Sequence, residues 1–315
     1  MPNVTIIGAG LIGRAWSAIF ARADWEVSVW DPVDSQCTAA TDLIGAQLDQ
    51  MALHGLCDNA ATAKARVRVV PSLETAVETA DFVQECGPEL LDAKKDLFKR
   101  LDKCTRPGVV IASSTSAIVP SLFTSELAGR DRCLVGHPVN PPHLVPVVEI
   151  CGAPWTSDQA KARAGEVYAG IGQVPIEVKK EIDGFILNRL QAALLTEAFR
   201  LVKEGYVTPK DLDHTVADGL GLRWSFMGPL ETIELNAPEG IADYCRRYSP
   251  FFRRTVETPP TATVWSDANI QAVADAWGPP PSAATVSNKS RWRDRRLAAL
   301  AAHKRLQSKS DAGAD

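Results

Sequence analysis

The sequence VTIIGAGLIGRA at residues 4–15 places a G-x-G-x-x-G motif directly after a short apolar strand and at the head of a helix. In this motif Gly8 permits a tight turn, Gly10 lets the backbone approach a pyrophosphate, and Gly13 lets strand and helix pack closely. The helix N-terminus, from Leu11 and Ile12, adds free N–H groups and a dipole that favours an anion. An isolated motif also describes an ordinary glycine turn, but this context predicts dinucleotide binding.

Asp31 follows a second apolar strand, immediately after Trp30. A carboxylate at that position can accept hydrogen bonds from the hydroxyls of an adenine ribose. It would repel the 2'-phosphate of NADP, and the following Pro32 and Val33 offer no cation to compensate. The sequence therefore favours NAD over NADP.

Short β-branched or apolar runs alternate with amphipathic stretches from residue 1 to 184. This pattern is typical of βα units around a mainly parallel, doubly wound sheet, so we expect an α/β, Rossmann-type NAD-binding domain. The predicted strands are 4–7, 26–30, 66–70, 82–85, 109–113, 133–137, 147–150 and 174–178.

The strand pattern stops at Phe185, and an all-α domain is expected over 185–315, serving substrate binding and dimerisation. Asp183-Gly184 marks the boundary, because glycine allows the chain to change direction. A run of apolar residues with helical spacing then predicts a buried helix. Its members are Phe185, Leu187, Leu190, Leu194, Leu195, Ala198, Leu201 and Val202. After the prolines at 279–281 we expect a surface helix and a frayed end.

The composition narrows the classes of function. The net charge of −4 offers no polybasic field for nucleic acid or anionic lipid. The seven cysteines are scattered, without the spacing of a metal site or a disulfide framework, so we expect no metal and a reducing cytoplasm. No apolar run reaches the roughly 20 residues of a membrane span, and no signal-peptide pattern opens the chain.

Polar residues suited to catalysis follow two of the predicted strands. The run 113–116, SSTS, ends one strand, and hydroxyls there can face a nicotinamide and a substrate, although a serine-rich helix cap is an equal alternative. His137 ends the next strand, and histidine has a pKa suited to a general base. Glu149 interrupts an apolar strand and could bind the other ring nitrogen, fixing the tautomer. Without such a partner, a structural histidine would be the commoner interpretation.

Several motifs together carry a family resemblance over nearly the whole chain. They are the glycine motif, Glu89 with Lys94, SSTS at 113–116, HPVNPP at 137–142, KEIDGFILNRLQ at 180–191, DGLGLR at 218–223 and GPLET at 228–232. This set resembles the 3-hydroxyacyl-CoA dehydrogenase superfamily, and more closely its lambda-crystallin or L-gulonate 3-dehydrogenase branch.

The resemblance implies a role for each matching residue. His137 would be the base and Glu149 its partner, while Ser116 and Asn188 would hydrogen-bond the reacting oxygen and the substrate. The resemblance also implies that Glu89, Lys94 and Asn140 lie near the ribose or nicotinamide of NAD, as does Ser116. For Asn188 a helix cap is the alternative, and for Glu89, Lys94 and Asn140 it is a solvated surface position.

Arg223 is a further candidate for substrate binding, because a guanidinium matches the carboxylate of a free acid. A structural ion pair is the alternative. The resemblance to the gulonate branch makes L-gulonate, oxidised to 3-dehydro-L-gulonate, the first of the possible free acids. Another sugar acid, a 3-hydroxybutyrate-like acid and a carnitine-like betaine stay open.

Two other functions stay open as well. A 3-hydroxyacyl-CoA substrate would need exposed cations, which Lys161, Arg163, Lys179 and Lys180 could supply. A structural protein that binds the dinucleotide without turnover would not require the set of Ser116, His137, Glu149 and Asn188. The resemblance and the apolar helical domain also predict a homodimer.

Overall fold

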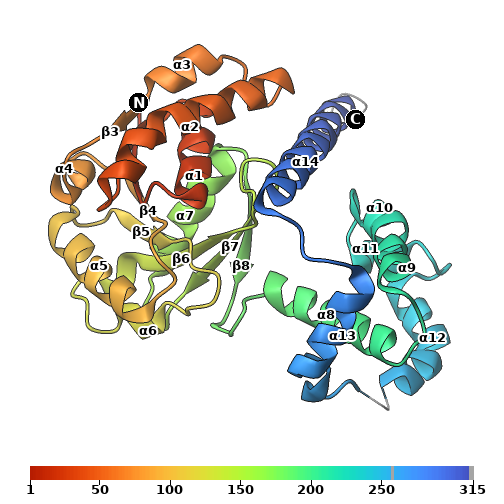
Figure 1. The fold of residues 1–315 in the computed structure, drawn as a ribbon. Coiled ribbons are helices and arrows are strands. Elements are labelled where there is room, and N and C mark those ends of the chain that lie inside the picture. Colours follow the sequence, from red (N-terminus) through yellow and green to blue (C-terminus); the bar gives the residue numbers. More distant parts are fainter. Residues whose placement is uncertain (257–258, 312–315) are drawn as a thin grey trace. The chain divides into compact units, whose positions relative to one another are not determined.

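The computed structural model describes residues 1–256 and 259–311 (Figure 1). Within them, eight strands form one sheet in the order β3-β2-β1-β4-β5-β6-β7-β8. The strands are β1 Asn3–Ile7, β2 Glu26–Trp30, β3 Val67–Val69, β4 Phe82–Glu85, β5 Val110–Ser113, β6 Cys133–Pro138, β7 Val147–Gly152 and β8 Val174–Val178. Neighbours pair in parallel except β6 and β7, which are antiparallel. The predicted α/β fold with a mainly parallel sheet is confirmed, and the predicted strand ends are displaced by no more than two residues.

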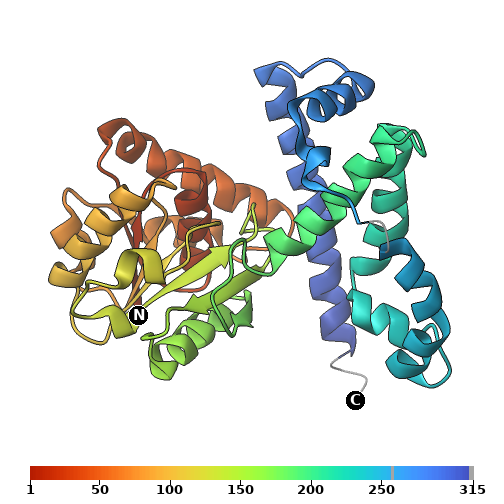
Figure 2. The same cartoon turned by 90° about the horizontal axis from the view of Figure 1, so that it is seen from below.

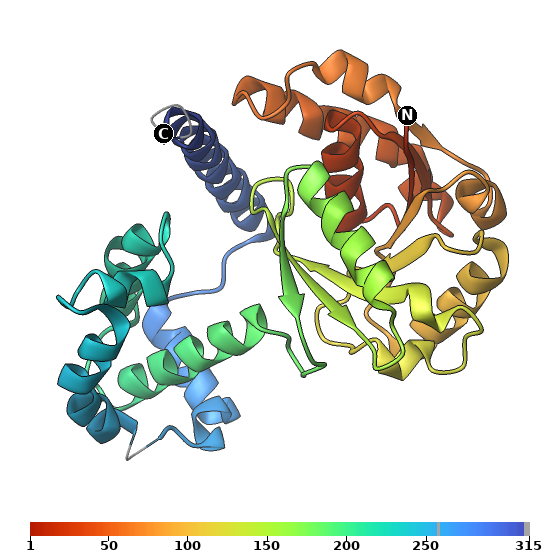
Figure 3. The same cartoon turned by 180° about the vertical axis from the view of Figure 1, so that it is seen from behind.

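Helices of the first unit lie on both faces of this sheet (Figure 1, Figure 2). They are α1 Leu11–Arg22, α2 Asp34–Leu53, α3 Ala60–Ala65, α4 Leu73–Val77, α5 Leu91–Cys104, α6 Ser121–Thr124, the 3-10 helix Arg130–Arg132, and α7 Asp158–Gly170. Two clusters of buried side chains form the core. One contains Trp16, Phe20 and Tyr168 from α1 and α7, and the other contains Phe98 from α5 and Phe123 from α6. Helix α7 lies over the strands β6 to β8 (Figure 3).

The described part of the chain after the sheet is helical. Its elements are α8 Leu187–Lys203, α9 Pro209–His214, a π-helix Thr215–Leu220, α10 Gly221–Trp224, α11 Pro229–Glu234, α12 Gly240–Val256, the 3-10 helix Ala262–Trp265, α13 Asp267–Trp277 and α14 Ala283–Asp311. Contacts divide the chain into one unit of residues 1–189 with 289–315, and a second unit of residues 190–288. Helices α8 and α14 therefore each contribute residues to both units.

The predicted buried helix is wrong in two respects. Helix α8 begins at Leu187 and leaves out Phe185, because Gly184 and Phe185 both have positive φ values that a right-handed helix does not contain. Of its residues, only Ala198 is buried, whereas Leu190 is 65% exposed in the single chain. The apolar spacing therefore identified a helix with an apolar face, and that face is uncovered.

Helix α14 packs on the first unit, whereas the sequence placed all residues after 184 in the second domain. Ala298 is 4% exposed and belongs to the same cluster as Trp16, with Leu297, Ala301 and Ala302 packed around it. Arg305 Nη1 donates a hydrogen bond to Gly55 O at 2.9 Å. Small side chains one turn apart give α14 a narrow apolar stripe that fits this surface. The polar tail expected after residue 306 continues α14 as far as Asp311, and its residues 312–315 lie outside the described residues.

Candidate active site

The glycine loop after β1 has the form expected of a dinucleotide cradle. Gly8 has φ +104°, and a Cβ there would stand 2.7 Å from Cys86 O. A Cβ on Gly13 would overlap Gly8 O, whereas a Cβ on Gly10 would meet no atom within 4 Å. Helix α1 has no side-chain cap at its N-terminus, so its first N–H groups remain available. Open space at Gly10 beside free donors fits a pyrophosphate.

Asp31 stands at the carboxyl end of β2, beside this loop. Its Oδ2 accepts a hydrogen bond from Ala9 N at 2.7 Å, and its Oδ1 accepts one from Val33 N at 2.8 Å. Each carboxylate oxygen can accept a further hydrogen bond, so ribose hydroxyls can still be bound. Asp31 therefore fixes the loop that precedes Leu11 and Ile12 while presenting negative charge where a 2'-phosphate would lie.

His137 and Glu149 form a buried pair near the carboxyl end of β6. They are directly opposite each other on the antiparallel strands β6 and β7, so their side chains share one face of the sheet. His137 Nδ1 lies 2.8 Å from Glu149 Oε2, and the two residues are 4% and 1% exposed. An ionised carboxylate only accepts hydrogen bonds, so Nδ1 carries the proton and Nε2 keeps a lone pair. The imidazole is thus set up to accept a proton at Nε2.

The second carboxylate oxygen of Glu149 holds the start of α8. Oε1 accepts hydrogen bonds from Ile186 N at 2.8 Å and from Leu187 N at 2.9 Å. Burial raises the pKa of Glu149, but the hydrogen bond from His137 and the two N–H groups outweigh burial, so the pKa lies below its ordinary value. The carboxylate is therefore ionised at neutral pH and can stabilise an imidazolium.

Glu89 organises the loop that carries Ser116. Its Oε1 accepts hydrogen bonds from Thr115 Oγ1 at 2.5 Å, from Ser116 N at 3.0 Å and from Ala117 N at 3.0 Å. Asn188 Nδ2 donates to Ser116 O at 2.9 Å, so the first turn of α8 is fastened to the same loop. The exposed Ser116 leaves its hydroxyl available to a substrate. The structure thus brings Glu89, Ser116 and Asn188 together.

Lys94 is not the solvated surface charge that the sequence offered as an alternative. It is 2% exposed, and its Nζ lies 2.9 Å from Glu85 Oε2. Ser113 Oγ donates to the same oxygen at 2.5 Å. This buried ion pair links α5 to the ends of β4 and β5, beneath the loop of Ser116. Sequence reasoning missed Glu85, although an acid that ends an otherwise apolar strand was a signal.

Asn140 and Arg223 are exposed. Asn140 lies in the loop between β6 and β7, three residues after His137. Arg223 lies on α10 in the second unit, and its guanidinium makes no hydrogen bond or ion pair within the described part of the chain. Sequence reasoning also missed Phe185, whose ring centroid lies 5.5 Å from that of His137.

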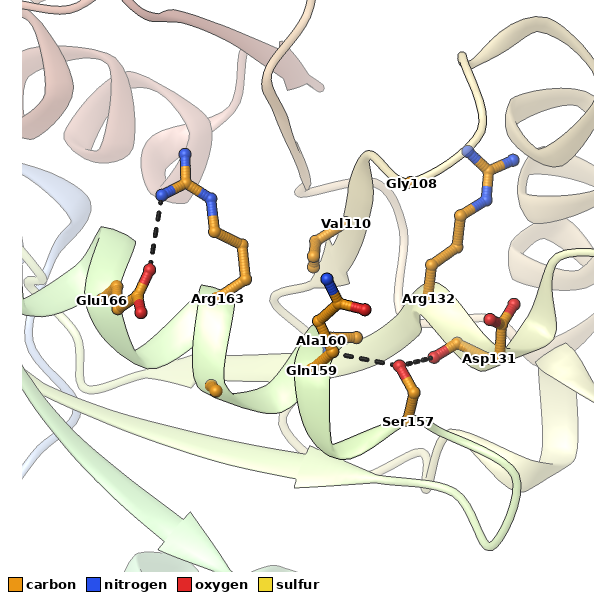
Figure 4. Close-up of a pocket in the computed structure, with 10 residues that line it drawn as sticks. Gly108, Val110, Asp131, Arg132, Ser157, Gln159, Ala160, Arg163 and Glu166 are labelled. Carbon is orange, nitrogen blue, oxygen red and sulfur yellow. Dashed lines mark hydrogen bonds and ion pairs between the residues drawn. The ribbon is translucent and has the colours of Figure 1, made fainter.

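A cavity of about 380 Å³ lies away from these residues (Figure 4). Gly108 and Arg132 line it where β5 and β6 begin, and Gln159 and Arg163 line it from α7. Arg132 is occupied by an ion pair with Asp102. Most of the polar groups expected from the sequence lie instead near the carboxyl ends of β1, β2, β4, β5 and β6, which is the side of an α/β sheet that binds ligands, whereas Arg223 belongs to the second unit.

Comparison with known proteins matches both parts of the chain to family models. Residues 3–182 match the model described as 3-hydroxyacyl-CoA dehydrogenase, NAD binding domain, and residues 184–267 match 3-hydroxyacyl-CoA dehydrogenase, C-terminal domain. Lambda-crystallin from Oryctolagus cuniculus is 40% identical over 96% of both chains. L-carnitine dehydrogenase from Pseudomonas aeruginosa is 36% identical over 93% of this chain and 91% of its own.

A solved structure with a similar fold is 5-formyl-3-hydroxy-2-methylpyridine 4-carboxylic acid 5-dehydrogenase, an NAD⁺-dependent dismutase. It is 26% identical, covers 95% of this chain and 97% of its own, and superposes with a TM-score of 0.82.

None of the helices in residues 1–256 and 259–311 has the length and apolar content that crossing a bilayer requires.

Proposed function

Because the chain belongs to the 3-hydroxyacyl-CoA dehydrogenase family, we propose that it oxidises the 3-hydroxyl of a small free hydroxy acid, with L-gulonate as the first candidate. The product would be 3-dehydro-L-gulonate. The cofactor is NAD, and the protein is an NAD-dependent oxidoreductase that acts on a secondary hydroxyl. The observation that carries the proposal is the buried pair of His137 and Glu149.

The pair supports a general-base role for His137. Nε2 would take the hydroxyl proton of the substrate, and the negative charge of Glu149 would stabilise the imidazolium that forms. NAD, held by the glycine loop and Asp31, would accept the hydride from the substrate carbon that bears this hydroxyl. Ser116 would donate a hydrogen bond to the reacting oxygen, and Asn188 would hold the loop that positions it.

Two observations favour a free acid over a CoA thioester. An L-carnitine dehydrogenase and a dehydrogenase named for a pyridine carboxylic acid match 93% and 95% of this chain. Of the four cations that a CoA groove would use, Lys161 lies 2.7 Å from Asp158 and Arg163 lies 3.6 Å from Glu166, both on α7, whereas Lys179 and Lys180 are exposed. The two cations on α7 are partly neutralised, and Arg163 lines the cavity near the amino-terminal ends of β5 and β6.

L-carnitine is the second candidate substrate. The L-carnitine dehydrogenase of Pseudomonas aeruginosa matches 93% of this chain, and carnitine is likewise a 3-hydroxy acid. The same base and partner would serve either substrate, so the difference must come from residues that contact the far end of the acid. For Arg223 we keep the role of binding the substrate carboxylate as a prediction.

The test is NADH formation by the purified protein with L-gulonate, other sugar acids, 3-hydroxybutyrate, L-carnitine and 3-hydroxybutyryl-CoA, each with NAD and with NADP. Turnover of a free acid with NAD supports the proposal and identifies the substrate. Turnover of the thioester alone contradicts it. Tight NADH binding without any turnover would favour a binding role.

We also propose a homodimer formed through the helical unit. Large apolar side chains of this unit are uncovered in the single chain, including Phe226 at 70% and Leu235 at 69%. Such surface is usually covered by a partner. A monomeric mass by light scattering at micromolar concentration would contradict this.

The seven free cysteines support a reducing compartment, and we propose the cytoplasm.

A further inference from the structure

The backbone immediately before α8 has an uncommon conformation. Gly184 has φ +76° and Phe185 has φ +48°. This region is readily accessible to glycine but strained for a residue with a Cβ, so the surrounding structure must hold Phe185 there. Phe185 is fully buried and belongs to the core cluster that contains Val135, Cys151 and Val178. Packing of the ring therefore maintains the strained turn.

The turn directs two successive N–H groups at one atom. Ile186 N and Leu187 N both donate to Glu149 Oε1, at 2.8 and 2.9 Å. Successive N–H groups at such a turn form a concavity that binds an anionic oxygen. The other oxygen, Oε2, accepts the hydrogen bond from His137 Nδ1. The orientation of the carboxylate is thus fixed from both sides.

Phe185 also contacts the histidine directly. The two ring centroids are 5.5 Å apart, with an angle of 36° between the ring planes. One residue therefore packs its ring against the imidazole while its backbone turns the adjoining N–H groups onto Glu149. Both members of the pair depend on the placement of this one side chain.

We propose that Phe185 is a positioning residue for the base, which holds the imidazole of His137 and the carboxylate of Glu149 in register through its ring and its left-handed backbone. The proposal rests on the proposed function for its effect on turnover. Its effect on the histidine itself can be observed without any substrate.

The activity test is a double-mutant cycle of Phe185→Leu with Glu149→Gln. Phe185→Leu should lower kcat/KM by roughly 10- to 100-fold, because a small displacement of a catalytic group has this effect. The double variant should then fall within about three-fold of Glu149→Gln alone, because both changes disable the same pair. NADH affinity should be unchanged within about three-fold, since Phe185 acts on the base.

Phe123→Leu is the matched control, because Phe123 is buried in the same cluster and packs against Phe98 at 4.7 Å. It removes a comparable ring without touching His137. Multiplicative losses in the cycle, or an equal loss of kcat/KM in Phe123→Leu, would overturn the proposal.

A second measurement separates failure of this inference from failure of the proposed function. ¹⁵N NMR of labelled histidine reports the tautomer, and a His137→Gln spectrum identifies the signal among the five histidines. His137 should carry its proton on Nδ1 in the unmodified protein and in Phe123→Leu, and should shift toward the Nε2–H form in Phe185→Leu. An unchanged tautomer in Phe185→Leu refutes the inference whether or not any acid is oxidised.

Discussion

Replacing Glu149 by glutamine tests the base most directly. The amide oxygen can still accept from Ile186 N and Leu187 N, which places the amide NH₂ against His137 Nδ1. Nδ1 must then accept a hydrogen bond, so the proton moves to Nε2 and the base can no longer take a proton there. In serine-protease triads the equivalent change costs about 10⁴-fold in kcat.

Because Glu149 likewise accepts the hydrogen bond from the Nδ1–H of a buried histidine, we expect Glu149→Gln to lower kcat/KM by about 10³- to 10⁴-fold, or about 4–5.5 kcal/mol of transition-state free energy. The assay is NADH formation with the acid that the panel identifies, with NADH binding followed by fluorescence. Binding should be unchanged. Glu177→Gln, at an exposed position of the neighbouring strand β8, is the control and should keep full activity. The reasoning is refuted if Glu149→Gln keeps more than about a tenth of the activity.

Three further changes test other parts of the site. Asp31→Ser should relax the preference for NAD by about ten-fold or more in the ratio of kcat/KM for NAD and NADP, and an unchanged ratio would remove Asp31 from the ribose site. Asn188→Ala removes the hydrogen bond to Ser116 O and should lower kcat/KM by roughly 10- to 100-fold with NADH binding unchanged; a loss confined to NADH binding would contradict this role. Burial lowers the pKa of His143 from 6.5 to about 4. Between these two pH values the unfolded chain protonates the ring while the folded protein keeps it neutral, so the free energy of unfolding falls as the pH drops from 6.5 toward 4. His143→Gln should therefore raise the free energy of unfolding at pH 5 by about 2 kcal/mol relative to pH 8, measured in urea, and an identical pH dependence in both proteins would count against it.

The sequence was sufficient to predict the sheet and the contact between His137 and Glu149. Alternation of apolar runs located every strand, because strands buried on both faces leave a continuous apolar signal. The pairing of His137 with Glu149 was also predictable, because an acid in a buried strand requires a partner. The structure adds that the two residues are direct cross-strand neighbours.

Other features depend on contacts that a linear pattern does not contain. The conformation of Phe185 results from packing in the core, so helical spacing alone placed it wrongly inside α8. From the sequence alone, Lys94 could equally be a surface charge, because its burial depends on an ion pair with Glu85 at the end of β4. The placement of α14 could not be foreseen either, since a stripe of alanines fits many surfaces.

The return of α14 to the first unit makes the dinucleotide-binding half discontinuous in the chain. Ala298 completes a cluster that begins with Val4, so the core around the first strand is closed only by the last described helix. During synthesis the N-terminal half therefore leaves the ribosome with part of its apolar surface uncovered, and a fragment ending at Arg189 would retain that defect. Removing the C-terminal helix should thus weaken a half of the protein from which it is remote in sequence.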